Sequence, residues 1–526
     1  MTTIIKKKSS HIITNRRFFS TITFVICFCF VGLGQTKINY KCAFSQMRPS
    51  LPDQIIMTGN VLFIHEGMKM HCDSAIFNEK ENWFNAFGHI HIEQGDTLHV
   101  WGDELYYVGA SKIAEMFSSP GKLVTMKDRK TILKTTYLVL EREPKTVSYT
   151  RWADINDDKS TLRSRFGVYH LDSKDIDFLT NVVIHSDSSS VFSDTLTYNT
   201  KTDLATFHGP TNIISKDSTF IYTEEGFYNT KTEESHSFKQ SQMLNRERLL
   251  QADTLFYSSV TKIGEGFHNI YMEDTLQKIV ATGHRAYINN NDTSAYTFLT
   301  NMAQIRQVDK EDTLYLHSDT IWINHDTAMN IKSALAFSHT KFFRPDFQGA
   351  ADTIFYLMED STVTMIGRPI IFNDGNQLTA DTIVLSIGKH SIYSALMYPN
   401  PLVVQNADTL TQGRYNQVSG RRMKGFFDNH NNLYLVEVHG NAQSIYYLWD
   451  EKKNKPKELM GLNVGQGSDM RIYVENKKIK KITTITNPVF FADDEQRVSK
   501  DEKFLKGFEW RDKERPKTKE DVFIQR

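Results

Sequence analysis

The fold of this chain is set by a short stretch that recurs along it, seen in one copy as Ala252-Asp253-Thr254-Leu255-Phe256-Tyr257. In an extended strand alternate side chains share a face, so Leu255 and Tyr257 lie on one side and Phe256 on the other. Threonine and aromatic residues favour such half-buried strands. The stretch therefore predicts a β-strand that begins at an aspartate.

Further copies lie on both sides, and internal repeats indicate a stack of similar units. A glycine follows three of the aspartates at the same distance of 15 residues. That length holds two strands and a turn and leaves no room for a helix. We interpret the following residues as structural anchors of the repeat: Asp73, Asp194, Asp253, Asp319, Asp352, Asp381, Gly88, Gly209 and Gly367.

The predicted fold is therefore all-β, an elongated repeat stack of antiparallel strands. A chain of 526 residues would ordinarily suggest several domains, but a stack whose units contact only their neighbours can reach this length undivided. The repeat is faint over residues 131–193. One continuous array and two consecutive blocks both remain open on this evidence.

The N-terminus resembles a secretory signal. Basic residues from Lys6 to Arg17 precede an apolar stretch from Phe18 to Leu33, which predicts cleavage before Gln35, with an uncleaved anchor as the alternative. Cleavage would leave Cys42 and Cys72, which could pair in an oxidising compartment although their spacing does not require it. The mildly acidic body of the chain argues against nucleic-acid binding.

The sequence shows no enzyme signature and predicts no cofactor. One aspartate per repeat is explained by hydrogen bonds to nearby backbone groups at turns. His89 and His91 alternate on a strand and could face one metal ion. Nearby spacing fixes no third ligand, so no metal site is predicted.

The repeats, of the form Ala-Asp-Thr-Leu-x-Tyr, a polar turn, Gly and then Asn/Pro-x-Ile, resemble the organic-solvent-tolerance (OstA/LptA-like) family of periplasmic lipopolysaccharide-transport proteins. The resemblance covers roughly residues 51–445. It implies an open β-jellyroll whose groove holds lipid acyl chains, and end-to-end assembly through unpaired strand edges. This chain is longer than the family's compact bridge protein and shows no late series of membrane strands, so we expect an enlarged form without the outer-membrane barrel.

The resemblance suggests a division of the chain and a set of groove residues. We expect a signal peptide (1–34), a linker (35–50), two OstA-like β-jellyroll blocks (51–250 and 251–445), a C-terminal β extension (446–496) and a charged, irregular tail (497–526). The repeat's apolar face either forms a filled core or partly lines a groove. Its groove candidates are Leu196, Tyr198, Leu255, Tyr257, Ile321, Ile323, Ile354, Tyr356, Ile383 and Leu385.

The leading hypothesis is a non-catalytic, exported periplasmic protein that shields the acyl chains of lipopolysaccharide (lipid A) on the way to the outer membrane. Association with the outer membrane is compatible with this hypothesis. Its partners would be other lipopolysaccharide-transport components, reached through strand edges, and further copies of itself, head to tail. One alternative is a structural or adhesive surface β-solenoid without lipid cargo. Another is a carbohydrate-active solenoid, which would require clustered carboxylates beside aromatic side chains.

Overall fold

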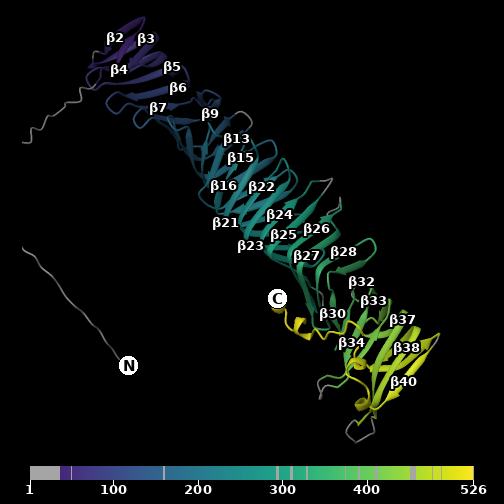
Figure 1. Cartoon of the computed structure of the whole chain (residues 1–526). Coiled ribbons are helices and arrows are strands. Elements are labelled where there is room, and N and C mark those ends of the chain that lie inside the picture. Colours follow the sequence, from purple (N-terminus) through teal and green to yellow (C-terminus); the bar gives the residue numbers. More distant parts are fainter. Residues whose placement is uncertain are drawn as a thin grey trace, which may run out of the picture.

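The computed structural model describes residues 36–48, 50–157, 160–291, 295–308, 312–326, 330–373, 375–388, 391–408, 413–450, 458–476, 478–486 and 488–524. These residues form an elongated, gently twisted stack of 40 strands joined into one sheet (Figure 1). Every pairing between the strands is antiparallel, as in β15 (Asp175–His185) with β16 (Ser189–Asn199). The predicted all-β, elongated stack of antiparallel strands is confirmed.

Each long strand bends sharply at its middle. In β15, Thr180 and Asn181 both have positive φ angles, and this pair lies opposite the single residue Asp194 of β16. Two residues against one is a β-bulge, which bends the strand and increases its twist. The same register shift recurs where Asp73, Asp253, Asp319 and Asp352 face a pair on the preceding strand.

Because the bends lie at one level, the sheet folds along a continuous corner into two faces. The first face holds the half-strands that contain the Asp-Thr repeat, such as 195–199, and the second face holds the other halves, such as 189–193. Inward side chains fill the space between the faces, and the alternating burial of β16 follows from this arrangement. The resulting hydrophobic core has one cluster from Ile38 to Ala336 and a second from Phe342 to Ile472.

The two-faced pattern runs through the regions that the sequence left open. Residues 131–193 contribute β9 (Thr131–Thr135) to β15 and the start of β16, which continue both faces. Strand β22 (Arg248–Ser258) spans the expected block boundary at residue 250. The core is interrupted instead within β27 (Ile331–Arg344), between Ala336 and Phe342.

The expected linker and extension are also part of the stack. Residues 35–50 include β1 (Asn39–Lys41) and β2 (Phe44–Arg48), which both pair with β3 (Leu51–His65). Residues 446–496 continue the stack through the end of β37 (Leu433–Asp450), β38 (Glu458–Glu475), β39 (Lys478–Ile485) and β40 (Val489–Asp493).

Three further expectations concern single features. The signal peptide expected at residues 1–34 lies outside the described residues. Cys42 and Cys72 are free thiols, and burial raises the pKa of the Cys72 thiol to about 12. The described part of the chain contains no helix long and apolar enough to span a membrane.

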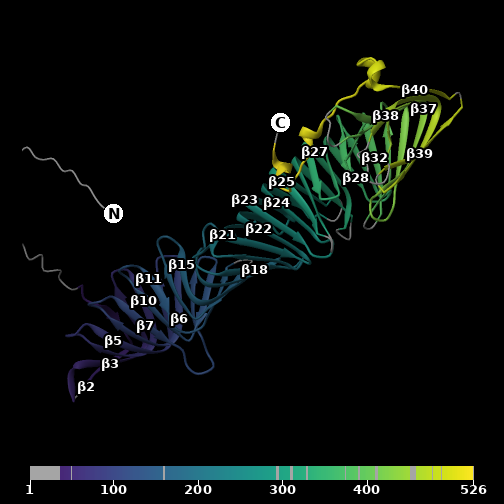
Figure 2. The same ribbon diagram turned by 90° about the horizontal axis from the view of Figure 1, so that it is seen from below.

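The charged tail is docked along the stack. Residues 494–524, which we call the C-terminal strap, contain four short 3-10 helices and run back over the outer side of the second face (Figure 2). Gln417 Oε1 accepts from Leu505 N at 2.8 Å, and Gln377 Nε2 donates to Glu509 O at 2.7 Å. The helices are η1 (Glu495–Arg497), η2 (Asp501–Lys503), η3 (Asp512–Glu514) and η4 (Asp521–Phe523).

Candidate functional site

A row of buried tyrosines joins the two faces along the hairpin edge, the side of the stack opposite the corner. Each tyrosine comes from the first face, and each polar partner lies 40 to 42 residues earlier, at the end of a second-face strand or, for Asp217, in the turn that follows one. The tyrosines are at most 3% exposed. The joined pairs are Tyr107 with His65 (2.5 Å), Tyr169 with Asp128 (2.7 Å), Tyr198 with Asp157 (2.8 Å) and Tyr257 with Asp217 (2.9 Å).

Charge and burial hold these contacts in their hydrogen-bonded form. Burial raises the pKa of Tyr198 far above its ordinary value, so its hydroxyl keeps the proton that it donates to Asp157. Lys174 Nζ lies 2.5 Å from Asp128 Oδ2, and Lys130 Nζ lies 3.4 Å from Asp157 Oδ1. Buried carboxylates therefore have both a donor and a counter-charge, and the two faces are held together over this part of the stack.

The tyrosine row ends at Tyr257. Strand pairing relates Tyr257 to Gly264, Gly264 to Ile288, Ile288 to Thr297, and Thr297 to Ile323. In the next layers, the large residues at the level of Tyr257 are therefore Ile288 and Ile323. Neither side chain has a hydroxyl group that could form a hydrogen bond to the opposite face.

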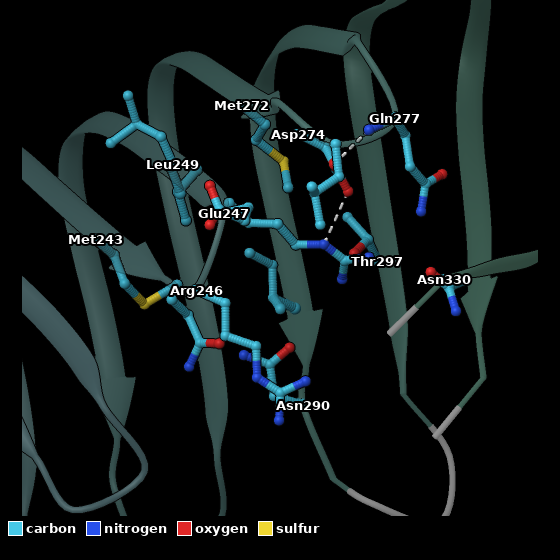
Figure 3. Close-up of a pocket in the computed structure, with 15 residues that line it drawn as sticks. Met243, Arg246, Glu247, Leu249, Met272, Asp274, Gln277, Asn290, Thr297 and Asn330 are labelled. Atoms are coloured by element: carbon cyan, nitrogen blue, oxygen red, sulfur yellow. Dashed lines mark hydrogen bonds and ion pairs between the residues drawn. The ribbon is translucent and has the colours of Figure 1, made fainter. Parts of the chain in front are cut away.

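An apolar cleft opens where the row ends. Two adjoining hollows of about 80 and 60 Å³ lie between the faces and share Arg248, Leu249, Met272, Asp274 and Thr297. Figure 3 shows the residues that line the first of them. The cleft lies between the second-face halves of β22, β23 (Ile263–Asp274), β24 (Ile279–Asn289) and β25 (Tyr296–Val308) on one side and the first-face halves of β25 and β26 (Thr313–His325) on the other. The apolar residues of its deeper hollow are Leu249, Met272, Ile279, Ala281, Leu299, Ile305, Ile321, Ile323 and Ile331.

The mouth of the cleft is polar. Arg248 Nε donates to Asp274 Oδ2 at 3.0 Å, and one guanidinium nitrogen of Arg248 lies 3.4 Å from His325 Nδ1 on the other face. His325 Nε2 lies 3.0 Å from Thr297 Oγ1. Arg246 also lines the outer hollow (Figure 3). The rim has mixed charge, with Arg246 and Arg248 beside Glu247 and Asp274. An apolar interior with such a polar, hydrogen-bonding rim suits an amphipathic ligand.

The structure places the ten groove candidates on the inner side of the first face but brings only two of them to the cleft, Ile321 and Ile323. Tyr356 is half-buried. Leu196, Tyr198, Leu255, Tyr257, Ile354, Ile383 and Leu385 are buried in the packed interior.

Sequence reasoning missed the second-face side of the cleft, above all Leu249, Met272 and Ile305. It also missed the polar partners of the tyrosines. The nearly constant separation of each tyrosine from its partner is a signal in the sequence, but it becomes readable only when the strand pairing is known.

The repeat aspartates sit at the corner, away from the cleft. The sequence suggested hydrogen bonds from these carboxylates to nearby backbone groups, but the carboxylates contact side chains in the bulge of the next strand. Asp73 Oδ2 lies 2.7 Å from His89 Nδ1, and Asp253 Oδ2 accepts from Asn269 Nδ2 at 2.8 Å. Asp319 and Asp381 make equivalent contacts with His339 and Asn400. Asp352 binds through its backbone N–H to Gly367 O, and Asp194 faces the bulge of β15.

The three anchor glycines have different roles. Gly88 and Gly367 have φ angles of +73° and +76°, and a Cβ at either position would lie 2.4 Å from the carboxylate of Asp73 or Asp352. Glycine is therefore required at both positions by backbone conformation and by space. Gly209 has no left-handed φ, and a Cβ there would meet open space, so no such requirement applies to it.

These features define a class of protein: an elongated, two-faced antiparallel β-stack with an apolar space between its faces. Residues 43–194 and 176–253 match the model of the OstA-like protein family. Over these residues, the N-terminal part of the stack is similar to the OstA-like family.

The comparison with solved structures includes LptH from Pseudomonas aeruginosa, described as the LptA-homologous periplasmic component of the conserved lipopolysaccharide transport device. It is 11% identical, with 28% of this chain and 93% of LptH covered and a TM-score of 0.21, and no inference rests on it. No curated protein matches the chain.

Proposed function

We propose that this chain is a non-catalytic periplasmic bridge protein that shields lipopolysaccharide acyl chains during their transport to, and assembly into, the outer membrane. The observation that carries the proposal is the apolar cleft between the faces, which begins where the tyrosine row ends. Each methylene buried there contributes about 0.8 kcal/mol. Binding therefore needs only an apolar surface, and no chemical step is involved.

The match of residues 43–253 to the OstA-like family model supports this role. In the proposed complex, the acyl chains lie among Met272, Ile305 and Ile323, and the anionic head lies at the mouth near Arg246 and Arg248.

The ends of the stack supply the proposed partner surfaces. Among the described residues, β2 pairs only with β3, and its Phe44 and Met47 side chains are 74% and 68% exposed. At the other end β40 pairs only with β38 and exposes Val489 and Phe490. Open strand edges bind other strands through main-chain hydrogen bonds, so we propose that other transport components or further copies of this chain add here.

The test is site-specific crosslinking in cells with a photoreactive phenylalanine analogue at Met272, Ile323 or Tyr198. We expect lipopolysaccharide to be captured from Met272 and Ile323, which line the cleft, and not from Tyr198, which is sealed in the tyrosine row. Phe192, on the outer side of the second face, is the matched control. Absence of lipopolysaccharide at both cleft positions would refute the proposal.

The second candidate is a structural or adhesive surface solenoid that carries no lipid. The observation that favours it is the packed interior before the cleft, where side chains such as Phe178 and Val191 are fully buried. This candidate predicts equal, background-level capture at Met272, Ile323 and Phe192.

A further inference from the structure

Three histidine side chains and one glutamate side chain gather on the outer side of the second face near one end of the stack. His71 comes from β4 (Met68–Asn78), His91 and Glu93 from β5 (Trp83–Gln94), and His99 from β6 (Leu98–Val108). Strand register places His71 opposite His91, and Glu93 opposite His99. Their sequence neighbours point into the core, so all four side chains project outward from a rigid sheet.

The distances within this cluster suit a metal ion. His91 Nε2 lies 3.1 Å from His99 Nδ1, and His91 Nδ1 lies 3.5 Å from Glu93 Oε1. His91, Glu93 and His99 each offer one ligand atom, and these three atoms all lie within 4.8 Å of one another. Two imidazole nitrogens that bind one zinc ion at about 2.0–2.1 Å lie roughly 3.3 Å apart in a tetrahedral site.

Aromatic stacking holds the imidazoles in place. Trp101 stacks on both rings, with centroids 5.0 Å from His91 and 5.7 Å from His99.

We propose that His91, Glu93 and His99 form a binding site for a divalent transition-metal ion of the zinc type. Two imidazoles and one carboxylate are the protein ligands, and the remaining coordination position faces solvent because the His91 and Glu93 side chains are 26% and 31% exposed. This nitrogen-rich set favours zinc over calcium or magnesium, which prefer all-oxygen sites. The ion joins β5 to β6 across their hairpin, and it acts independently of the cleft.

The neighbouring His89 provides a matched control. It lies at the corner, where its Nδ1 is 2.7 Å from Asp73 Oδ2, and it takes no part in the cluster. His89→Ala and His91→Ala therefore remove the same chemical group from nearby positions. His91→Phe removes the ligand nitrogens while keeping an aromatic ring to stack on Trp101.

The experiment titrates the metal-free full-length protein with Co²⁺, followed by visible absorption, and with Zn²⁺, followed by calorimetry. We expect one equivalent to bind with the absorption of a four-coordinate site, and affinity to fall at least about tenfold in His91→Ala, His91→Phe and His99→Ala. His89→Ala should bind as the parent protein does. Quenching of tryptophan fluorescence by Cu²⁺ should be strong in the parent protein and much weaker in Trp101→Phe, because Trp101 contacts both ligands.

Circular dichroism of each variant establishes that the fold is retained. If His89→Ala weakens binding as much as His91→Ala does, or if no variant changes the Co²⁺ or Zn²⁺ titration, the proposal is overturned. The cluster is then a stacked ladder joined by an N–H···N hydrogen bond between His91 and His99.

Discussion

Single residues at the corner determine where each strand bends. An aspartate faces the bulge of the preceding strand and binds the bulge of the following one, as Asp253 does with Lys239 and Gln240 behind it and Asn269 ahead. Polar side chains on left-handed residues supply the donors. Where the bulge begins with glycine, as at Gly367, the aspartate carboxylate, here that of Asp352, lies directly over the glycine backbone.

We predict that Gly367→Ala destabilises the protein by about 1–3 kcal/mol, because alanine at a left-handed φ is strained and its Cβ would lie 2.4 Å from Asp352 Oδ2. Gly209→Ala is the control and should change stability little, since its Cβ meets open space. Urea denaturation midpoints of the two variants check the prediction. Equal shifts would show that the corner does not depend on glycine.

The inward orientation of residues such as Leu196 and Ile323 was predictable from the sequence, because strand alternation alone determines it. Whether they line a cleft was not, since that depends on the separation of the two faces. Contacts such as Tyr198 with Asp157 set this separation, and they join residues that are neighbours only after the sheet has folded. The cluster of His91 and His99 was likewise hidden, because it depends on strand register.

Among the elements, the C-terminal strap has the most unusual packing. It supplies polar partners to a series of outward-facing glutamines that would otherwise be exposed, from Gln417 through Gln377 to Gln348. At its far end Phe523 covers His317 of β26, with ring centroids 4.7 Å apart. The strap therefore ties several layers together on one side of the stack.

We predict that stability falls as the pH drops below about 6.5 and that His317 is one cause. Burial lowers the pKa of His317 from its ordinary value of 6.5; Lys341 and His339 act in the same direction, and the Ala303 hydrogen bond and Asp319 oppose them. The unfolded chain therefore takes up the proton first, so this contribution is present above pH 6.5 and is lost as the pH falls.

The measurement compares melting temperatures between pH 7.5 and 5 for the parent protein and His317→Asn. Asparagine can keep a donor toward Ala303 O but does not titrate. We expect a smaller loss of stability on acidification in the variant. An unchanged pH profile would assign the effect to other histidines.

The whole molecule combines a sealed part, an open cleft and a second core. In a stack each layer contacts only its neighbours, so stability is a local property along its length. The hydrophobic core is divided between Ala336 and Phe342. We therefore expect the parts of the stack on either side of this division to unfold separately.

We predict that hydrogen exchange reports this separation. Gly88→Ala should speed amide exchange in β3 to β6 and leave β32 (Thr382–Ile387) to β36 (Arg422–Phe427) unchanged, and Gly367→Ala should do the reverse. Mass spectrometry of exchanged peptides measures both regions in one experiment. A uniform increase along the chain in either variant would show that the stack unfolds as a single cooperative unit.

The strap also determines which part of the molecule is completed last. The surfaces it covers, such as Phe372 under Arg515 and Tyr447 beside Val498, belong to strands that precede it in the chain. Residues 494–524 can dock only after those strands have paired. Docking of the strap is therefore a late step of folding, and these apolar surfaces stay uncovered until it takes place.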